Sequence, residues 1–255
     1  MKSNNLAILT GSEGMLGTAI ARLLRENSFD IICMDKLPNA VHPYSTTYIP
    51  GDITLKSCIE ELFSISIHDI ASQYQSLSLI NNAGVAVFTP TEDRSYEEYR
   101  IVTDVNMWAP IMCTIALSKK LNEFRLNYPE INLLASCVNI SSIYGVVTPN
   151  PAIYVDTPRH SSEIYGATKA ALNHLTRYFS ARYADKICVN AICPGGILNT
   201  SVQGPEFIQR YSSLVPMGRL CTEDDVASMV KFLCIDRPSY LTGQVISLDG
   251  GLTTW

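Results

Sequence analysis

Tyr165 and Lys169 stand four positions apart in the run YGATK, which opens a stretch with helical periodicity. Residues at positions i and i+4 lie on one face of a helix, one turn apart. A phenol titrates near pH ~10 in isolation, and a neighbouring ammonium group favours its ionised form. This pair could therefore donate and accept a proton near neutral pH. The same spacing is common on ordinary surface helices, so it indicates acid–base chemistry only together with other groups.

A serine and a glycine-rich loop are further candidates. Ser142 follows the apolar run 136–140, where its hydroxyl could hydrogen-bond a substrate oxygen. The loop Thr10–Gly17 reads TGSEGMLG and lies between an apolar run and a helical pattern. Glycines let the backbone approach a pyrophosphate, and the following helix supplies free N–H groups and a favourable dipole. The spacing is not the usual GxGxxG, so an ordinary strand-to-helix turn is the alternative. Glu13 would oppose phosphate unless its side chain faces solvent.

Asp35 is a candidate for recognising a nucleoside. It follows the apolar run 31–34, 24 residues after Gly11. A carboxylate in this place can accept hydrogen bonds from both ribose hydroxyls of an adenosine and would repel a 2′-phosphate. The loop 11–17 holds no basic residue, so NAD(H) is favoured over NADP(H), with Lys36 as the one feature against. On position alone, a solvated turn residue is an equal interpretation of Asp35.

The elements that must position these groups follow from periodicity. Short apolar runs alternate with amphipathic stretches, and apolar strands interleaved with helices predict a parallel sheet covered on both faces. Right-handed crossovers then give one α/β domain with a doubly wound, Rossmann-type sheet. Ligands bind such sheets beyond the carboxyl ends of the strands. We expect strands at 6–9, 31–34, 48–49, 77–80, 136–140, 187–192 and 245–248, and helices at 15–26, 58–63, 97–124 (broken near Pro110), 164–183 and 224–234.

Composition excludes several classes of protein. The chain has 255 residues, of which 47% are hydrophobic and 17% charged, with a net charge of −5. This apolar fraction excludes a disordered chain, and the acidic balance argues against nucleic-acid binding. The eight cysteines form no CxxC pair or Cys/His cluster, so we expect no metal and a reduced, cytoplasmic setting. Neither a signal peptide nor a membrane-spanning run is expected, since no 18 consecutive residues are apolar.

Taken together, the motifs resemble the short-chain dehydrogenase/reductase family over nearly the whole chain. The joint order of glycine loop, strand-end aspartate, NNAG, helical asparagine, strand-end serine and YxxxK carries this resemblance. The matching segments are Thr10–Gly17, 51–53, 81–84, Asn106, 139–142, 165–169, 194–197, 240–244 and 249–251.

This resemblance implies specific catalytic roles. Tyr165 would be the general acid/base, and Lys169 would lower its pKa and hold the nicotinamide ribose. Ser142, three residues before Gly145, would orient the substrate carbonyl or alcohol in preference to Ser141. Asn106 would kink its helix and hold a water that links Lys169 to solvent.

The resemblance also implies how a nicotinamide dinucleotide would bind. Asp52 and Ile53 would contact the adenine, Asn82 to Gly84 would line the adenosine ribose, and the Ile197 backbone would meet the carboxamide. The full set of expected cofactor-binding residues is Gly11, Ser12, Gly14, Met15, Leu16, Gly17, Asp35, Lys36, Asp52, Ile53, Asn82, Ala83, Gly84, Pro194, Gly195 and Ile197.

The chain also departs from the family pattern. Met15 replaces a glycine of the classical loop, and Asn199 stands where a threonine is common. Ser142 and Tyr165 are 23 residues apart, more than is usual. We expect the extra segment, together with residues 197–220, to form a small substrate lobe or lid near 145–164. Its polar residues suggest a hydroxylated or anionic substrate, and the candidate contacts are Tyr144, Tyr154, Arg159 and His160. A surface loop that contacts a neighbouring subunit is the alternative.

The first functional hypothesis is an NAD(H)-dependent oxidoreductase that interconverts a secondary alcohol and a ketone. A weaker resemblance to dehydrogenases of flagellin modification and legionaminic-acid pathways suggests a sugar-like substrate and carbohydrate biosynthesis. A 3-oxoacyl-carrier or general carbonyl reductase is the alternative, and a non-catalytic nucleotide-binding protein is the second, since fold does not fix function. The family's pairing of long helices, here about 99–126 and 163–184, implies a homodimer or homotetramer. A small-molecule substrate is the other expected partner.

Overall fold

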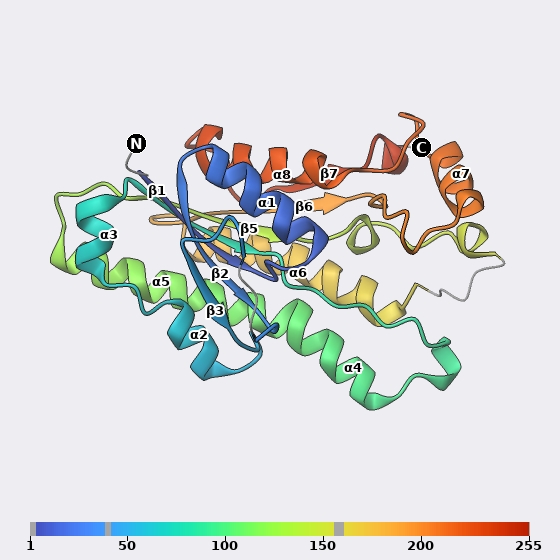
Figure 1. The fold of residues 1–255 in the computed structure, drawn as a ribbon, viewed down its shortest axis with the longest axis horizontal. Helices are drawn as coiled ribbons and strands as arrows, with labels where there is room; N and C mark the ends of the chain where they lie inside the picture. Colours follow the sequence, from blue (N-terminus) through green and yellow to red (C-terminus); the bar gives the residue numbers. More distant parts are fainter. Residues whose placement is uncertain (1–3, 39–41, 156–160, 255) are drawn as a thin grey trace.

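A parallel sheet forms the centre of the molecule (Figure 1). The computed structural model describes residues 4–38, 42–155 and 161–254. Within these residues the sheet has seven strands in the order β3-β2-β1-β4-β5-β6-β7. The strands are β1 (Asn5–Thr10), β2 (Phe29–Asp35), β3 (Thr47–Pro50), β4 (Ser76–Asn81), β5 (Leu134–Ile140), β6 (Cys188–Pro194) and β7 (Val245–Leu248). The direction of chain progression reverses between β1 and β4, so their carboxyl ends form the switch point where a ligand is expected.

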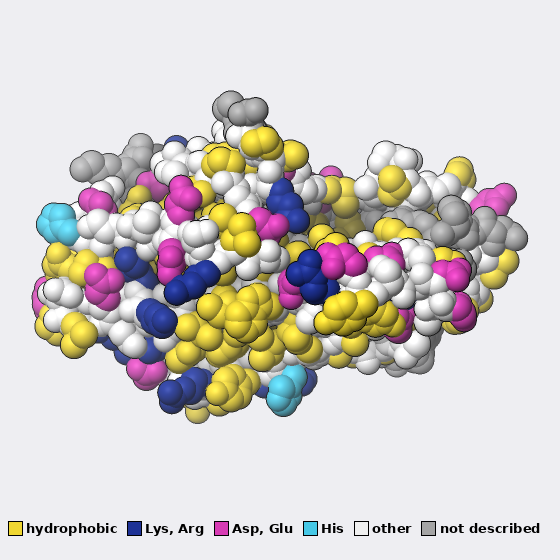
Figure 2. Space-filling view, turned by 90° about the horizontal axis from the view of Figure 1, so that it is seen from below, with side chains coloured by type: hydrophobic (Ala, Val, Ile, Leu, Met, Phe, Trp, Pro, Cys, Tyr) yellow, Lys and Arg dark blue, Asp and Glu magenta, His cyan; other side chains and the backbone are white. Residues whose placement is uncertain are grey.

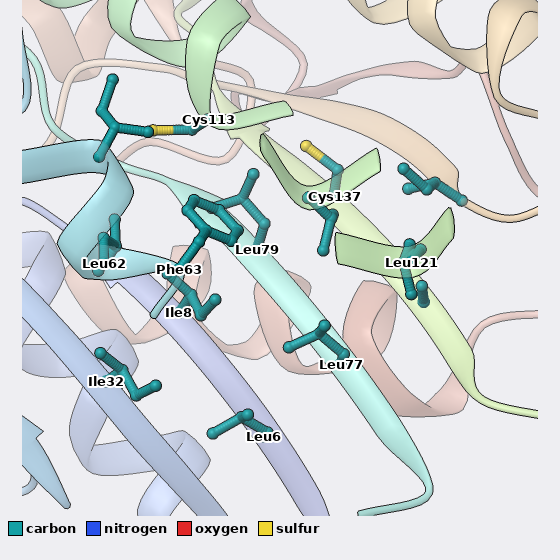
Figure 3. Packing of buried hydrophobic residues seen from close by; sticks show 14 of the residues in the cluster. Leu6, Ile8, Ile32, Leu62, Phe63, Leu77, Leu79, Cys113, Leu121 and Cys137 are labelled. Atoms are coloured by element: carbon teal, nitrogen blue, oxygen red, sulfur yellow. The ribbon is translucent and has the colours of Figure 1, made fainter. Parts of the chain in front are cut away.

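Helices cover both faces of this sheet. They are α1 (Met15–Glu26), α2 (Lys56–Leu62), α3 (Ile67–Gln73), α4 (Tyr96–Thr103), α5 (Ala109–Asn127), α6 (Glu163–Arg182), α7 (Pro205–Leu214) and α8 (Glu223–Lys231). Residues of α2, α3, α5 and α6 pack with the sheet in one hydrophobic cluster, part of which Figure 3 shows. Residues of α1 and α8 form a second cluster on the other face. The five inner strands are buried nearly throughout because both of their faces are covered, whereas the edge strands β3 and β7 are largely only partly buried or exposed.

The predicted fold class is confirmed, but two helices were not predicted. Among the described residues, the sequence patterns missed α3 and α7, which are short. The break expected near Pro110 is present as a π-helical turn over Asp104–Trp108. Pro110 follows this turn directly, at the start of α5, and its missing N–H group disturbs the regular helix there.

A third, smaller cluster joins two segments beyond the carboxyl ends of the strands. Ile153 comes from the short 3-10 turn Pro151–Tyr154, and its buried partners are Tyr211, Val215 and Leu220. The long connection between β5 and α6 therefore packs against the region that contains α7. These are the two segments that the sequence assigned to a substrate lobe.

One helical stretch meets the length and composition expected of a membrane span. It runs over Tyr96–Asn127, and 50% of its most apolar window is buried inside the fold. Burial of this kind is typical of a core helix, so the stretch is weak evidence for a membrane span.

Candidate active site

The glycine loop lies directly against the end of β4, across the switch point. Gly11 has a φ of +68°, and a Cβ there would lie 2.7 Å from the Ala83 Cα. The Asn82 side chain donates hydrogen bonds to the carbonyl oxygens of Thr10 (3.1 Å) and Gly11 (2.8 Å). A Cβ on Gly17 would lie only 2.1 Å from the Gly11 oxygen. These positions require glycine because the turn, the strand end and the helix are in close contact.

The first turn of α1 is suited to an anion. Gly14 is the N-cap, no side chain caps the helix, and the first turn holds no acidic residue. The first N–H groups of a helix lack intrahelical partners, so those of α1 can bind a pyrophosphate. Met15 is exposed and, like Ser12 and Gly14, belongs to this loop. The loop therefore fits the phosphates of a dinucleotide.

Two carboxylates lie at the ribose end of this region. Asp35 accepts a hydrogen bond from the Glu13 backbone N–H at 3.0 Å. Lys36, the cation that weighed against NAD(H), lies 3.4 Å from Asp52 and so is turned toward another carboxylate. One carboxylate oxygen of Glu13, Oε1, does not face solvent, because it is buried and has no hydrogen-bond partner among the described residues. Burial, Asp35 and Glu13 together raise the pKa of Tyr48 to about 12. Negative charge therefore gathers around the end of β2.

Ser142 and Tyr165 meet at the chemical end of the site. A hydrogen bond between their side chains lowers the pKa of Tyr165, but burial has the larger effect and raises it. The neighbouring Ser141 instead donates to the carbonyl oxygen of Lys169 at 3.1 Å, which supports the choice of Ser142. The expectation that Lys169 lowers the Tyr165 pKa was wrong for the free protein, in which burial raises this pKa and the Ser142 hydrogen bond opposes the rise. Tyr165 is therefore a neutral phenol in the free protein.

Lys169 is buried below the Tyr165 ring. Lys169 is only 4% exposed, and its Nζ lies 5.7 Å from the centroid of the Tyr165 ring. The Nζ donates a hydrogen bond to the Ile140 carbonyl oxygen at 2.8 Å. Burial lowers the pKa of Lys169 to about 8, because removing an ammonium group from water disfavours its charged form.

Replacing Lys169 by Met is expected to stabilise the free protein at neutral pH. Below about pH 8 the wild-type fold carries a buried charge, and this cost disappears as the pH rises from about 8 to the unfolded value of 10.5. The unfolding free energy of Lys169→Met should exceed that of the wild type by the largest amount below pH 8. This difference should fall by up to about 3 kcal/mol between pH 8 and pH 10.5. Denaturant titrations of both proteins at pH 7 and 10.5 measure it. An advantage that grows with pH would contradict the assigned direction.

Asn106 lies in the π-helical turn, as the expected kink requires. Its Oδ1 accepts from the Val85 N–H at 2.8 Å, and its Nδ2 donates to the Val85 carbonyl at 2.9 Å and to Thr168 at 3.3 Å. A Cβ on Gly84 would lie 3.5 Å from the Lys169 Nζ and 3.6 Å from the Asn106 Oδ1. Asn106 therefore holds the segment after β4 beside Lys169.

A cavity of about 380 Å³ connects these groups. Of the expected cofactor residues, those that line it are Leu16, Asn82, Gly84, Pro194, Gly195 and Ile197. Ser142, Tyr165 and Lys169 line it as well. The buried Ile53 lies away from it, next to Asp52 at the ribose end. Ser142, Tyr165 and Lys169 thus share one space with six of the sixteen expected cofactor residues, whereas the loop glycines, Asp35 and Asp52 do not line it.

Aromatic side chains form the substrate side of this cavity. Tyr144 and Tyr154 line it and share a hydrogen bond of 2.6 Å between their hydroxyl groups. The sequence analysis missed Phe88, Phe207 and Tyr211, which also line it. The only available signal was the Gly204-Pro205 pair that starts α7. Arg159 and His160 lie outside the described residues.

Tyr211 also supports the backbone that follows β6. Its hydroxyl oxygen accepts a hydrogen bond from the Gly196 N–H at 2.5 Å. The Ile197 carbonyl accepts from the Gln203 side chain at 2.8 Å, and the Asn199 side chain accepts from Ser201. The departure at Asn199 therefore serves the local turn. Over the described part of the chain, no group of three or more His, Cys, Asp and Glu side chains is placed to bind a metal.

Comparisons with known proteins agree with this geometry. A family model described as enoyl-(acyl carrier protein) reductase matches residues 12–253. A tropinone reductase homolog of Arabidopsis thaliana is 36% identical over 69% of the chain, and the match spans 61% of that protein's length. The 3beta-hydroxysteroid dehydrogenase 1 of Eggerthella lenta is 27% identical over 97% of the chain and 93% of its own length.

Solved structures are similar over the whole fold. A short chain dehydrogenase from Leptospira borgpetersenii with bound NAD+ has a TM-score of 0.81 and 33% identity, covering 99% of this chain and 94% of its own. ElxO with NADP bound has a TM-score of 0.78 and 25% identity, covering all of both chains. The family model and these relatives agree with the geometry of the site. The chain therefore belongs to the short-chain dehydrogenase/reductase family and is an NAD(P)-dependent oxidoreductase.

Proposed function

We propose that this protein is an NAD(H)-dependent dehydrogenase/reductase that interconverts a cyclic secondary alcohol and its ketone. The observation that carries the proposal is the meeting of Ser142, Tyr165 and Lys169 on one cavity that extends as far as Leu16, at the start of α1. A proton donor is of no use to a protein that only binds a nucleotide. The complete catalytic set therefore favours an enzyme over a sensor on the same fold.

The chemistry divides between cofactor and protein. The bound nicotinamide supplies or accepts the hydride, and the protein supplies position and a proton. In the reduction, Ser142 and Tyr165 donate hydrogen bonds to the carbonyl oxygen, and Tyr165 gives its proton to that oxygen as negative charge develops on it. Lys169 and Ser142 then stabilise the phenolate that remains. In the oxidation, the phenolate accepts the alcohol proton. Asn106 serves the proton path between Lys169 and solvent through a held water.

The raised Tyr165 pKa supports this assignment of the acid. Burial keeps the phenol protonated in the free protein, so the proton is in place when a ketone binds. A general acid must be protonated at the working pH and must lose its proton only as charge develops on the substrate.

Recognition of NAD(H) is assigned to the ribose pocket. Asp35 can accept hydrogen bonds from both ribose hydroxyls. Glu13 adds negative charge beside it, and Lys36 forms an ion pair with Asp52. Asp35→Ala is expected to weaken NADH binding roughly tenfold or more, the effect of losing hydrogen bonds to a charged group. NADPH binding should change little, because its 2′-phosphate gains from removal of the charge. Fluorescence titration measures both dissociation constants, and equal losses would refute the ribose assignment.

The substrate class is inferred from the cavity wall. The faces of Tyr154, Phe207 and Tyr211 suit a compact ring, and the hydroxyl groups of Tyr144 and Tyr154 can bind its substituents. A sugar-like ring, with C–H faces and several hydroxyls, is the first class to test. An apolar alicyclic ketone is the second, favoured by the aromatic lining and by the hydroxysteroid dehydrogenase among the relatives.

A substrate panel tests the proposed function. NADH oxidation and NAD+ reduction should be followed by absorbance with cyclic sugars, keto sugars, alicyclic ketones and 3-oxoacyl thioesters. Turnover with a cyclic substrate supports the proposal. Turnover confined to acyl thioesters would replace it by a carrier-dependent reductase, and binding of NADH without turnover on any substrate would favour a sensor.

We also propose that residues 145–155, 161–164 and 197–220 cover the bound substrate, since their small common core adjoins the cavity.

We further propose that the protein assembles into a homodimer or homotetramer through the surface of the helices that bear the site. Ile101, Trp108 and Tyr178 are exposed on the helical face of α4 to α6, and Figure 2 shows hydrophobic side chains gathered among basic ones on the side of α4 and α5. Light scattering that gives the mass of one 28.1 kDa chain would contradict assembly.

A further inference from the structure

Arg94 is a buried cation at the edge of the active site. Its side chain is 0% exposed and forms an ion pair with the Glu163 carboxylate. A second guanidinium nitrogen donates to the Thr89 carbonyl oxygen. Arg94 belongs to the segment between β4 and α4, whereas Glu163 is the first residue of α6, two positions before Tyr165. The ion pair thus joins two parts of the chain that are 69 residues apart.

Glu163 receives further hydrogen bonds from the same side. The Tyr99 hydroxyl in α4 donates to one carboxylate oxygen at 2.5 Å, and the Thr91 hydroxyl donates to the other at 3.3 Å. Burial opposes ionisation of Glu163, but the hydrogen bonds from Arg94 and Tyr99 outweigh it and lower its pKa to about 2. The carboxylate therefore keeps its charge and its partners at every pH at which the enzyme would work.

The segment 84–95 is a wall of the cavity that is fastened at two points. Near its start, Val85 is bonded to Asn106, and Phe88 then lines the cavity. At its end, Arg94 is bonded to Glu163. Since Tyr165 lies in the same helical turn as Glu163, the second fastening fixes the phenol relative to the opposite wall.

The start of α6 is held on two sides. On the side of the cavity, Ser142 bonds Tyr165 and Asn106 bonds Thr168 at 3.3 Å. The Ser162 hydroxyl caps the helix by accepting from the Tyr165 N–H at 3.0 Å, a contact within the same turn. Arg94 and Tyr99 bond the first residue of the helix, Glu163, from another part of the chain.

We propose that the Arg94–Glu163 ion pair is a positioning device for Tyr165, required for turnover and dispensable for cofactor binding. The proposal rests on the assignment of Tyr165 as the general acid/base. Neither residue contacts the reacting atoms. They act by holding the first turn of α6 against segment 84–95, where a displacement of about 1 Å is enough to lower turnover by roughly a hundredfold.

The test uses three variants, which are Arg94→Met, Glu163→Gln and the double variant that combines these two changes. Each is compared with a control variant, Glu98→Gln. Glu98 bonds Thr89 and Ser95 within the same segment but makes no bond to α6, so it is the matched control. Both single variants should lower kcat roughly ten- to a hundredfold while the NADH dissociation constant stays at the wild-type value. The double variant should be no worse than the poorer single one, because the two residues act as a unit. Glu98→Gln should keep the wild-type kcat.

Hydrogen exchange provides a second readout that needs no substrate. Amides of residues 164–168 should exchange faster in Arg94→Met and Glu163→Gln than in wild type or Glu98→Gln, all measured with NADH bound. The positioning role would be overturned if exchange at these amides were unchanged. It would also be overturned if the losses of kcat in the two single variants multiplied in the double variant, or if Glu98→Gln lost as much kcat as they do. Absence of turnover in the wild-type protein, with the exchange differences present, would instead overturn the proposed function.

Discussion

A Tyr165→Phe variant is expected to lose turnover by roughly a thousandfold, within the range that a general acid contributes, and to bind NADH as the wild type does. The change removes one oxygen, which hydrogen-bonds Ser142 and would carry the transferred proton. The ring that covers Lys169 stays in place. Steady-state kinetics and fluorescence titration measure the two quantities separately.

Tyr178→Phe is the control for this variant. Tyr178 lies in the same helix, α6, and is exposed, so the same chemical change there should alter neither turnover nor NADH binding. Turnover that survives in Tyr165→Phe would mean that another group supplies the proton. A matching loss of NADH affinity would mean that the hydroxyl acts mainly in binding.

The second large effect is expected from one added methyl group at Gly145. A Cβ there would lie 2.6 Å from the Lys169 carbonyl carbon and 2.8 Å from the Ala170 nitrogen. Because both atoms belong to helix backbone, the short turn Ile143–Gly145 must move away from α6. Gly145→Ala should therefore separate Ser142 from Tyr165, lowering kcat roughly a hundredfold and the unfolding free energy by about 1–3 kcal/mol.

Gly204→Ala separates this effect from the general cost of replacing glycine. A Cβ at Gly204 meets nothing within 4 Å, so this variant should keep its kcat and lose less stability than Gly145→Ala, through the poorer N-cap that alanine gives α7. Thermal unfolding and kinetics should be measured for both variants. Equal kcat values for Gly145→Ala and wild type would show that the close approach of the turn to α6 does not set the Ser142–Tyr165 contact.

The order of strands and long helices could be predicted because each repeats a simple pattern. Buried parallel strands are apolar throughout, and long helices have a regular apolar face. The helices α3 and α7 escaped prediction for a physical reason. Each is short, and α7 packs its apolar residues, including Tyr211, against the small lobe instead of the sheet. A helix with only a few apolar residues shows a hydrophobic periodicity that is too weak to be recognised in the sequence.

The site could be predicted where chemistry depends on spacing along the chain, as for Tyr165 and Lys169. It could not be predicted where the outcome depends on burial or on distant partners. The raised Tyr165 pKa follows from burial, which a sequence does not state. The partnership of Arg94 with Glu163 joins two loops whose approach is set by the tertiary fold, and each residue alone resembles any surface charge.

The anchoring of α6 has a consequence for how such chains can change in length. Asn139 of β5 bonds Thr176 in the middle of the helix at 2.9 Å, Ser141 bonds its backbone at Lys169, and Arg94 holds its first residue. One inserted residue rotates everything on one side of it by about 100°, so an insertion between Tyr165 and Thr176 would turn the phenol off its target. Residues added upstream of Glu163 would leave this register unchanged, and the long connection between β5 and α6 lies there.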